Sequence, residues 1–289
     1  MEEIKKITIN DPDYPKLLKK ILNPPKVLYY KGNIKNSEPY FAIVGTRRYS
    51  SYGKQITYDI TNNLTDSGFI IVSGLAPGID TFAHTSVIQK KQKTIAILGT
   101  GLDQKSIYPK ENIKLAQQII EFGGCLISEY PPGTKGSRFT FPQRNRIISG
   151  ISYGTLVIEA KEKSGSLITA NYAFSQKRKV FAVPGSIFCL NSRGSHNLIK
   201  RGAKLVENAN DILKELKLFN LTSSNKKEII IETSNENLIL NILKQQPLHL
   251  DKIIEKTKLD APTISSILII LEINGQIKNI GENIYTLTH

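Results

Sequence analysis

Short apolar runs recur along the first three quarters of the chain, and most are followed by glycine or proline and then by a helical pattern. Continuous apolar runs are typical of strands buried on both faces, as in a parallel sheet. We expect strands at 40–44, 69–73, 94–98, 124–128, 155–158, 180–183 and 204–206. The repeated strand-then-helix order predicts an α/β fold, a doubly wound, mostly parallel, extended Rossmann-like sheet that binds ligands at the carboxyl ends of its strands.

The pattern divides the 289 residues into four segments. Residues 1–38 are a leader whose proline-rich turns argue against regular structure. The Rossmann-like domain covers 39–219 and closes with a helix at 207–219. A polar linker at 220–235 leads to residues 236–289, where three helical stretches and a terminal hairpin predict a small C-terminal winged-helix domain.

Charge is distributed unevenly between these segments. The chain has 39 basic and 25 acidic residues, a net charge of +14. From Asn220 onward there are 7 lysines and 8 acidic residues, so the tail carries −1 and the first 219 residues carry +15. All eight arginines lie between Arg47 and Arg201, and arginine is the side chain best suited to bidentate phosphate contact. A polyanionic partner is therefore expected at the middle of the chain.

Cysteine and histidine give no sign of metal or redox chemistry. Cys125 and Cys189 stand in or beside apolar runs without a CxxC pair, as in a reducing compartment. The histidines show no metal-ligand spacing: His84, His196, His249 and His289. The sequence has no secretory signal, transit peptide or apolar run as long as a membrane span. We expect a cytoplasmic protein without metal, cofactor or membrane contact.

The loop after the first strand combines glycine with two cations. Its residues are Gly45, Thr46, Arg47 and Arg48, and Ser50, Ser51 and Gly53 open the next helix. Glycine lets the backbone approach an anion, and a helix N-terminus offers unpaired N–H groups. We therefore expect phosphate contact here. Neither G-x-G-x-x-G nor G-x-x-x-x-G-K-[ST] occurs, so the sequence supports neither a dinucleotide cofactor nor ATP hydrolysis.

A long polar loop after the fourth strand interleaves arginine with phenylalanine. Its candidate residues are Arg138, Phe139, Phe141, Arg144, Asn145 and Arg146. Cations for phosphates and ring faces for bases are what a single nucleic-acid strand requires. We expect one of Phe139 and Phe141 to dock the loop onto the sheet and the other to be free. Pro142 should hold Phe141 in extended geometry.

Two further candidate sites lie at or near the starts of predicted helices. After the fifth strand, Lys163, Ser164, Gly165 and Ser166 form an anion nest at a predicted helix start. Asp80 and His84 lie four residues apart and share a helix face. An acid–base pair is conceivable there. We expect a structural role instead, with Asp80 bonding local backbone and His84 packing or bonding Asp80.

Several ordered motifs together resemble the DNA-processing protein A (DprA, Smf) family. They are VGTRRYSSYG, SGLAPGIDTFAH, AILGTGLDQKSIYP, SEYPPGTKGSRFTFPQRNRIISG, VIEAKEKSGSLITANYA, VFAVPG and SHNLIKRGA, within roughly residues 10–215. The resemblance implies a homodimeric protein without established catalytic activity. It would bind single-stranded DNA and load the RecA recombinase onto it in natural transformation or recombination.

Family binding residues transfer by position. The resemblance implies that Arg47 and Lys163 contact phosphates, that Gly45 and Thr46 supply backbone, that Arg138 is the basic residue of the long loop, and that Phe141 stacks on a base.

Two other classes of function remain open. A nucleoside-monophosphate phosphoribohydrolase would use a glycine-rich loop ahead of G-T-x-x-E, of which Gly154 to Glu159 is a partial echo with Ser152 and Tyr153 replacing the glycines. An oxidoreductase is disfavoured by the missing dinucleotide fingerprint. Free-base release and nicotinamide binding, respectively, would reveal them.

Overall fold

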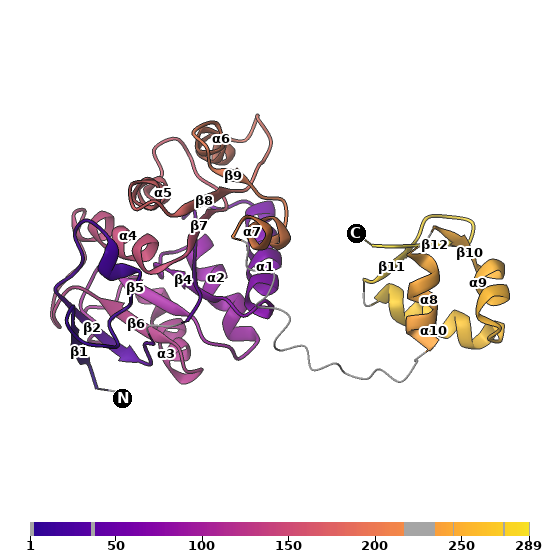
Figure 1. Cartoon of the computed structure of the whole chain (residues 1–289), viewed down its shortest axis with the longest axis horizontal. Coiled ribbons are helices and arrows are strands. Elements are labelled where there is room, and N and C mark those ends of the chain that lie inside the picture. The colour runs from indigo at the N-terminus through magenta and orange to yellow at the C-terminus, as the bar shows by residue number, and fades with distance from the viewer. Residues whose placement is uncertain (1–2, 36–37, 217–234, 245, 274, 289) are drawn as a thin grey trace. The chain divides into compact units, whose positions relative to one another are not determined.

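The chain forms two compact units, Met1–Asn225 and Lys226–His289. The computed structural model describes residues 3–35, 38–216, 235–244, 246–273 and 275–288 (Figure 1). Among these, no helix is both long and apolar enough to cross a membrane.

The first unit is built on a nine-stranded sheet with the order β1-β2-β6-β5-β4-β3-β7-β8-β9. The seven strands from β6 to β9 are parallel to their neighbours, and β1 and β2 join antiparallel at one edge. Their bounds are β1 (Lys5–Thr8), β2 (Val27–Gly32), β3 (Tyr40–Val44), β4 (Ile70–Ser73), β5 (Ile95–Leu98), β6 (Cys125–Ser128), β7 (Gly154–Val157), β8 (Lys179–Ala182) and β9 (Lys204–Leu205). The predicted Rossmann-like fold and its seven parallel strands are confirmed.

Helices cover both faces of this sheet (Figure 1). One face carries α1 (Ser51–Asp66), α2 (Ile79–Gln89), α3 (Ile113–Glu121) and α7 (Ala209–Glu215). The other carries α4 (Thr140–Ile151), α5 (Gly165–Ser175), α6 (Arg193–Lys200) and the short 3₁₀ helix η1 (Leu18–Lys20). Two more 3₁₀ turns are η2 (Lys110–Asn112) and η3 (Leu190–Ser192).

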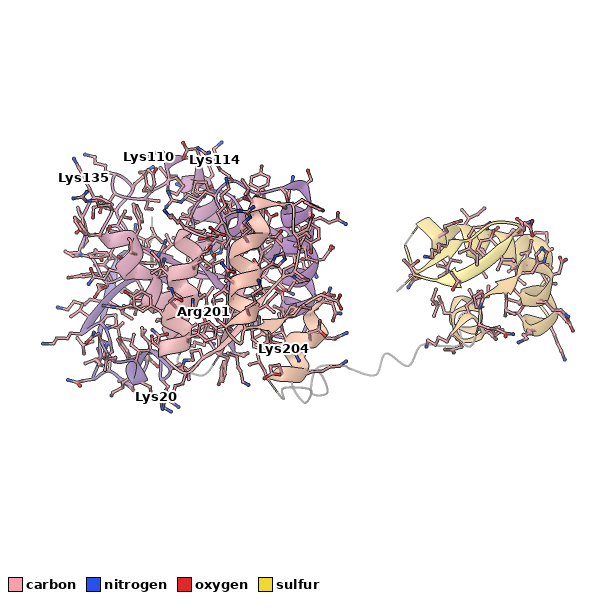
Figure 2. The ribbon with its side chains drawn as sticks, turned by 90° about the horizontal axis from the view of Figure 1, so that it is seen from above. Lys20, Lys110, Lys114, Lys135, Arg201 and Lys204 are labelled. Atoms are coloured by element: carbon pink, nitrogen blue, oxygen red, sulfur yellow. The ribbon has the colours of Figure 1, made fainter. Side chains whose placement is uncertain are left out.

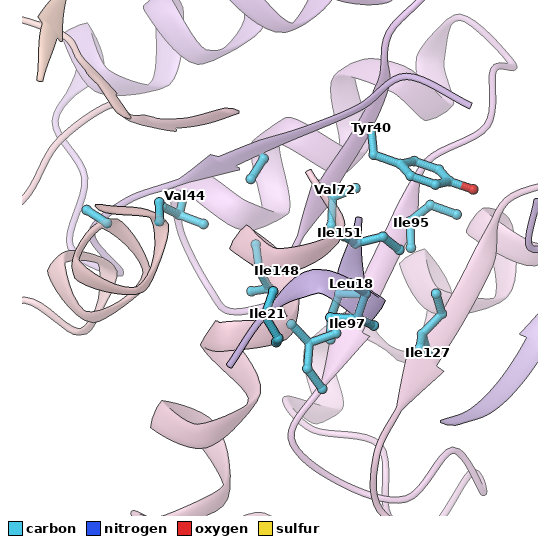
Figure 3. Packing of buried hydrophobic residues seen from close by; sticks show 14 of the residues in the cluster. Leu18, Ile21, Tyr40, Val44, Val72, Ile95, Ile97, Ile127, Ile148 and Ile151 are labelled. Carbon is cyan, nitrogen blue, oxygen red and sulfur yellow. The ribbon is translucent and has the colours of Figure 1, made fainter. Parts of the chain in front are cut away.

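The strand residues alternate between the two layers. In β3, Tyr40, Ala42 and Val44 pack with α4 and η1, whereas Phe41 and Ile43 pack with α1 and α2. Figure 3 shows the first of these layers, with isoleucines of α4 against the sheet. Every residue of β3 is buried, so helices or loops cover the strand on both faces of the sheet.

The prediction that residues 1–38 lack regular structure is wrong. This segment contributes β1, β2 and η1, and β2 pairs antiparallel with β6, Tyr29 opposite Ser128. The prolines precede β2 instead of interrupting it, and the hydroxyl of Tyr14 donates a hydrogen bond of 2.7 Å to the carbonyl oxygen of Pro25. Leu18 is completely buried, so the segment belongs to the core of the first unit.

The strand order places a topological switch point between β3 and β7. From β3 the chain proceeds outward through β4 and β5 to β6, and it then returns through α4 to start β7 on the other side of β3. The loops that follow β3 and β7 therefore diverge onto opposite faces of the sheet. Such a divergence leaves a crevice at the carboxyl ends of the strands.

The second unit is the predicted winged-helix domain. It comprises α8 (Asn235–Leu243), β10 (Leu248–His249), α9 (Leu250–Thr257), α10 (Ala261–Ile273), β11 (Ile277–Asn279) and β12 (Ile284–Leu287). Its three strands form an antiparallel sheet with β12 in the centre. The linker predicted at 220–235 lies outside the described residues, apart from Asn235 at the start of α8, and so does the end of the closing helix predicted at 207–219.

Candidate nucleic-acid interface

A cavity of about 590 Å³ opens at the switch point, between the loop after β3 and the starts of α4 and α5. The structure brings twelve of the thirteen predicted site residues together in its lining: Gly45, Thr46, Arg47, Arg48, Arg138, Phe141, Arg144, Asn145, Lys163, Ser164, Gly165 and Ser166. Arg146 is the exception. Lys161 also lines the cavity and was not predicted, although its place two residues before Lys163 is a signal that sequence reasoning could have used.

The β3–α1 loop is held rigidly against the start of α2. A Cβ atom on Gly45 would lie 2.6 Å from the side chain of Ile79, and one on Gly78 would lie 2.5 Å from the carbonyl oxygen of Thr46. The amide of Thr46 donates to the carbonyl oxygen of Glu159 (2.8 Å). Because the backbone is fixed in this way, the exposed side chain of Arg47 extends from a well-defined position.

The expected anion site at the N-terminus of α1 is occupied by the protein itself. The carboxylate of Glu159 accepts hydrogen bonds from the Ser50 amide (3.0 Å) and the Ser50 hydroxyl (2.6 Å). Glu159 is only 2% exposed, and a Cβ on Gly53 would lie 2.3 Å from its Oε2 atom. The Ser50 amide and hydroxyl are therefore not available to a phosphate, contrary to the expectation for this helix end, and the exposed side chains of Arg47 and Arg48 are the cations that this loop offers.

The start of α5 has an open glycine. Ser164 caps the helix, its hydroxyl accepting from the Ser166 amide (3.4 Å) and lying 2.8 Å from the Ser166 hydroxyl. A Cβ on Gly165 would meet no protein atom within 4 Å. Packing within the described residues therefore does not require glycine at this position, and the space beside it is available to a ligand.

The loop before α4 ends earlier than predicted. α4 begins at Thr140, so Phe141 is helical rather than extended, and Arg144 and Asn145 lie on the helix. Proline is tolerated in a first helical turn because its missing N–H has no partner there, which explains Pro142. The Ser137 hydroxyl accepts from the Thr140 amide (3.2 Å) and supports this start.

The two phenylalanines of this segment have different environments. Phe141 is half-buried: a Cβ on Gly136 would lie 2.4 Å from its ring, and the ring of Tyr108 has its centroid 5.6 Å away. Part of the same ring lines the cavity. Phe139 is 67% exposed, with the guanidinium of Arg138 4.9 Å from its centroid. Phe141 thus fixes the segment, while Phe139 is the freer ring.

Arg144 lines the cavity, but its side chain is buried and bonded to the protein's own backbone. It is 4% exposed and donates through Nη1 to the carbonyl oxygens of Gly74 (2.7 Å) and Ile97, at the ends of β4 and β5. Burial lowers the pKa of Arg144 to about 10, against the opposing effect of Asp80. Two of its five donor positions therefore serve the protein's own backbone.

Asp80 and His84 both have structural roles, as predicted. Asp80 accepts from the Gly74 amide (3.1 Å), and burial raises its pKa despite the nearby cations Arg144 and Arg47. His84 is fully buried and lies 2.9 Å from the Thr94 hydroxyl, and burial lowers its pKa to about 3. Its neighbour is therefore Thr94 rather than Asp80.

Arg146 does not line the cavity. Its guanidinium forms a salt bridge with Glu129, and the Arg146 side chain is 11% exposed. The pair joins α4 to the residue after β6. It therefore stabilises the fold, and no described contact directs it toward the site.

The cations around the cavity are exposed and lack acidic partners. Arg47, Arg48, Arg138, Lys161 and Lys163 form no salt bridge with any acidic residue of the described ranges. In the same part of the chain, no group of three or more His, Cys, Asp or Glu residues could hold a metal ion. The site is thus a basic crevice with an aromatic wall.

The fold and this crevice define an α/β protein of the Rossmann-like class that carries a winged-helix domain. A family model described as DNA recombination-mediator protein A matches residues 5–217, and one described as DprA winged helix domain matches residues 227–281. The chain belongs to the DNA recombination-mediator protein A family.

Individual relatives agree. The chain is 46% identical over 215 residues to the DNA processing protein DprA of Bacillus subtilis, covering 74% of this chain and 71% of that protein. The X-ray structure of DprA from Streptococcus pneumoniae matches with a TM-score of 0.68 and 44% identity, covering 74% of each chain. A Helicobacter pylori DprA structure, whose description concerns its single-stranded DNA binding mode, matches with a TM-score of 0.66 and 31% identity, over 75% of this chain and 99% of that one.

Proposed function

We propose that this protein binds single-stranded DNA in the switch-point cavity, in the cytoplasm and without catalysing a reaction on it. The observation that carries the proposal is the set of five exposed cations without described acidic partners around one half-buried aromatic ring. Cations that are not neutralised by the protein attract phosphates, and a ring face stacks on an unpaired base. Family membership and the description of the Helicobacter pylori relative support the same ligand.

Single-stranded DNA fits the cavity better than a duplex does. In a duplex the base faces are stacked on one another, so they are not available to Phe141. The arginines and lysines alone would bind either form through its phosphates. The aromatic wall therefore gives the preference for a single strand.

The geometry argues against the phosphoribohydrolase alternative. In the partial G-T-x-x-E echo, Glu159 would have to act on a ligand, yet its carboxylate is buried and accepts both donors of Ser50. Glu159 is also absent from the cavity lining. Incubation with nucleoside monophosphates should release no free base, and release would overturn the non-catalytic proposal.

The test is the affinity for a single strand and for a duplex of equal length, each measured at two salt concentrations. We expect tighter binding of the single strand and a log affinity that falls linearly with log salt, because phosphate contacts release counterions. Equal affinity for both forms at physiological salt would contradict the role of the aromatic wall.

Arg47 and Lys163 provide a sharper test. They lie on opposite sides of the switch point, after β3 and β7, and line one cavity, so we propose that they contact adjacent phosphates. Alanine at either should weaken all sequences alike and lower the salt slope by about 0.7 for a single strand. Lys179→Ala is the control, because Lys179 pairs with Glu215 outside the cavity. An unchanged slope would show that the side chain neutralises no phosphate.

We further propose that the protein is a homodimer that loads the RecA recombinase onto the bound strand. Support for RecA is membership of a recombination-mediator family. Support for a protein contact is the apolar segment after β8, where Ile187 is 72%, Phe188 91% and Leu190 54% exposed. Contiguous exposed apolar side chains are typical of interaction surfaces.

Phe188→Asp tests the dimer. We expect the variant to sediment as a monomer while retaining its melting temperature, since an exposed ring contributes little to packing. RecA assembly on DNA should be accelerated by the parent protein. A parent that is monomeric at micromolar concentration, or that leaves RecA assembly unchanged, would overturn the respective proposal.

A further inference from the structure

A second hollow, of about 620 Å³, adjoins the cavity on the outer side of the sheet's α5 layer. It lies between α5 and α6, and we call it the α5–α6 groove. Lys163, Ser164 and Gly165 line both hollows, while Lys200 and Arg201 line the groove alone. The start of α5 is therefore a common wall, and a ligand crossing it passes directly from the cavity into the groove.

The groove carries positive charge at the end away from this wall. Lys200 is exposed and forms no salt bridge with an acidic residue among those described. Arg201 donates from Nη1 to the Asn171 Oδ1 atom (3.0 Å) and lies 5.6 Å from the ring centroid of Phe174. Arg201 is exposed and is labelled in Figure 2. The guanidinium is held in place with most of its donors unused.

Gly165 is the open position of this common wall. Apart from its chain neighbours and the backbone of its own helix, no atom of the described residues lies within 4 Å of the position that a Cβ would take there. A glycine that internal packing does not require permits close approach by another backbone. The lining of the groove includes one acid, Glu162, against three cations, so its net charge suits a polyanion.

We propose that single-stranded DNA leaves the cavity over Gly165 and continues along the α5–α6 groove, with phosphates beside Lys200 and Arg201. This inference rests on the proposed function. From Gly165 to Asn171 the helix rises about 9 Å, at roughly 1.5 Å per residue. That is two to three nucleotides of a stacked strand at about 3.4 Å each. The groove thus lengthens the site without adding any reading of base sequence.

The surplus of positive charge does not continue past the groove. Beyond Phe174 lies a third hollow, whose lining has three carboxylates (Glu207, Asp211 and Glu215) and three cations (Arg178, Lys179 and Lys204). Lys179 and Glu215 form a salt bridge there. This hollow has no net charge, so the attraction for phosphates is strongest up to Arg201.

The experiment compares oligothymidylates of about 4 to about 16 nucleotides, the usual range of single-strand site sizes. The parent should gain affinity with length as the strand fills the cavity and then the groove. For Lys200→Glu we expect short-oligonucleotide affinity within twofold of the parent and a loss of about tenfold for long oligonucleotides. Lys200→Gln should lose less and lower the salt slope for long strands by about 0.7, the value for one phosphate contact on a single strand.

Lys20→Glu is the matched control. Lys20 is an exposed lysine beside the start of β3, whereas the cavity lies at the carboxyl ends of the strands, and it is labelled in Figure 2. Lys20→Glu changes the net charge by as much as Lys200→Glu does. It should therefore lower the affinity for oligonucleotides of every length slightly and to the same extent.

Three outcomes overturn the inference: unchanged binding of long strands by Lys200→Glu, equal weakening of short and long strands, or the same length-dependent loss in Lys20→Glu. A parent that binds no single strand of any length would instead overturn the proposed function. Lys200 is exposed at the end of α6, so unchanged thermal melting checks that the variant is folded.

Discussion

The two units of this chain belong to folds that both bind nucleic acid in other proteins, yet their charges are arranged differently. The α/β unit gathers around one cavity five cations that form no salt bridge with its described acidic residues. In the winged-helix unit, α10 has no lysine or arginine, and Ile269 and Ile270 are 57% and 46% exposed. A DNA-reading winged helix places basic residues on its recognition helix. The fold of a unit therefore indicates less about its ligand than the placement of its charges.

Local pairing reinforces this contrast. In α9, Lys252 and Glu255 form a salt bridge of 2.7 Å, and the carboxylate of Asp260 accepts from the amide and hydroxyl of Thr263. These charges are satisfied within their own helix or helix start. Among the described residues of the winged-helix unit, no cavity is surrounded by cations as in the α/β unit, and exposed isoleucines are typical of protein contacts.

The largest expected effect is a loss of folding stability in the α/β unit. Arg144→Met removes the buried donor of two hydrogen bonds to the carbonyl oxygens of Gly74 and Ile97. Each buried polar group that loses its partner costs about 1–3 kcal/mol. Denaturant unfolding followed by hydrogen exchange should show this loss in the α/β unit alone. Arg48→Met, at an exposed position, is the control, and an equal loss in the winged-helix unit would contradict the independence of the units.

The next effect concerns the aromatic wall of the cavity. Phe141→Ala should reduce single-strand affinity by about 1–3 kcal/mol and leave the salt slope unchanged, because stacking is lost and no charge is. Since Phe141 is only half-buried, the loss of stability should stay below the roughly 3–5 kcal/mol of a fully buried ring. Phe139→Ala is the comparison. If it costs the affinity while Phe141→Ala costs only stability, stacking belongs to Phe139.

A third effect is a pH dependence of folding stability that arises from His84 in the α/β unit. His84 has a pKa of about 3 in the folded protein and about 6.5 when unfolded. Below pH 6.5 the unfolded chain binds a proton that the folded chain does not. Stability should therefore fall by about 1.4 kcal/mol per pH unit as pH decreases from 6.5 toward 3. Urea unfolding at pH 7 and pH 5 measures this, and His84→Gln should remove that part of the dependence, whereas His196→Gln should not.

The smallest expected effect on DNA affinity is that of removing the winged-helix unit. A chain ending at residue 219 lacks the winged-helix unit, and it should lose less than tenfold in single-strand affinity, about 1.4 kcal/mol. The charge distribution is the reason, because the removed segment carries −1. A greater loss in a filter-binding or anisotropy assay would mean that the winged-helix unit makes a principal DNA contact.

The sequence predicted the parts of the fold that local pattern controls. The apolar run at 40–44 coincides with β3, because a strand buried on both faces needs only continuous apolar residues. β2 was missed because its place depends on pairing with β6, almost a hundred residues away. The start of α4 was misplaced because Pro142 suits a first helical turn as well as it suits a loop.

The candidate site was predicted as a set of loops, and its internal packing was not. Twelve residues converge because the carboxyl ends of parallel strands share one edge. The contact of Glu159 with Ser50 spans 109 residues, and the packing of Phe141 depends in part on Gly99, which follows β5. No local pattern contains such information.

The carboxylate of Glu159 at the start of α1 has a consequence for how a strand would travel. Backbone N–H groups hold a phosphate in one fixed place, but here the protein's own carboxylate accepts from the amide and the hydroxyl of Ser50. In the proposed role, the phosphates meet long side chains such as those of Arg47 and Lys163, whose charged ends can follow a moving partner. A bound strand can then advance by a nucleotide while its charge stays neutralised. In that proposed role we expect a low barrier to sliding, so that a recombinase bound to one end of the strand can draw it out.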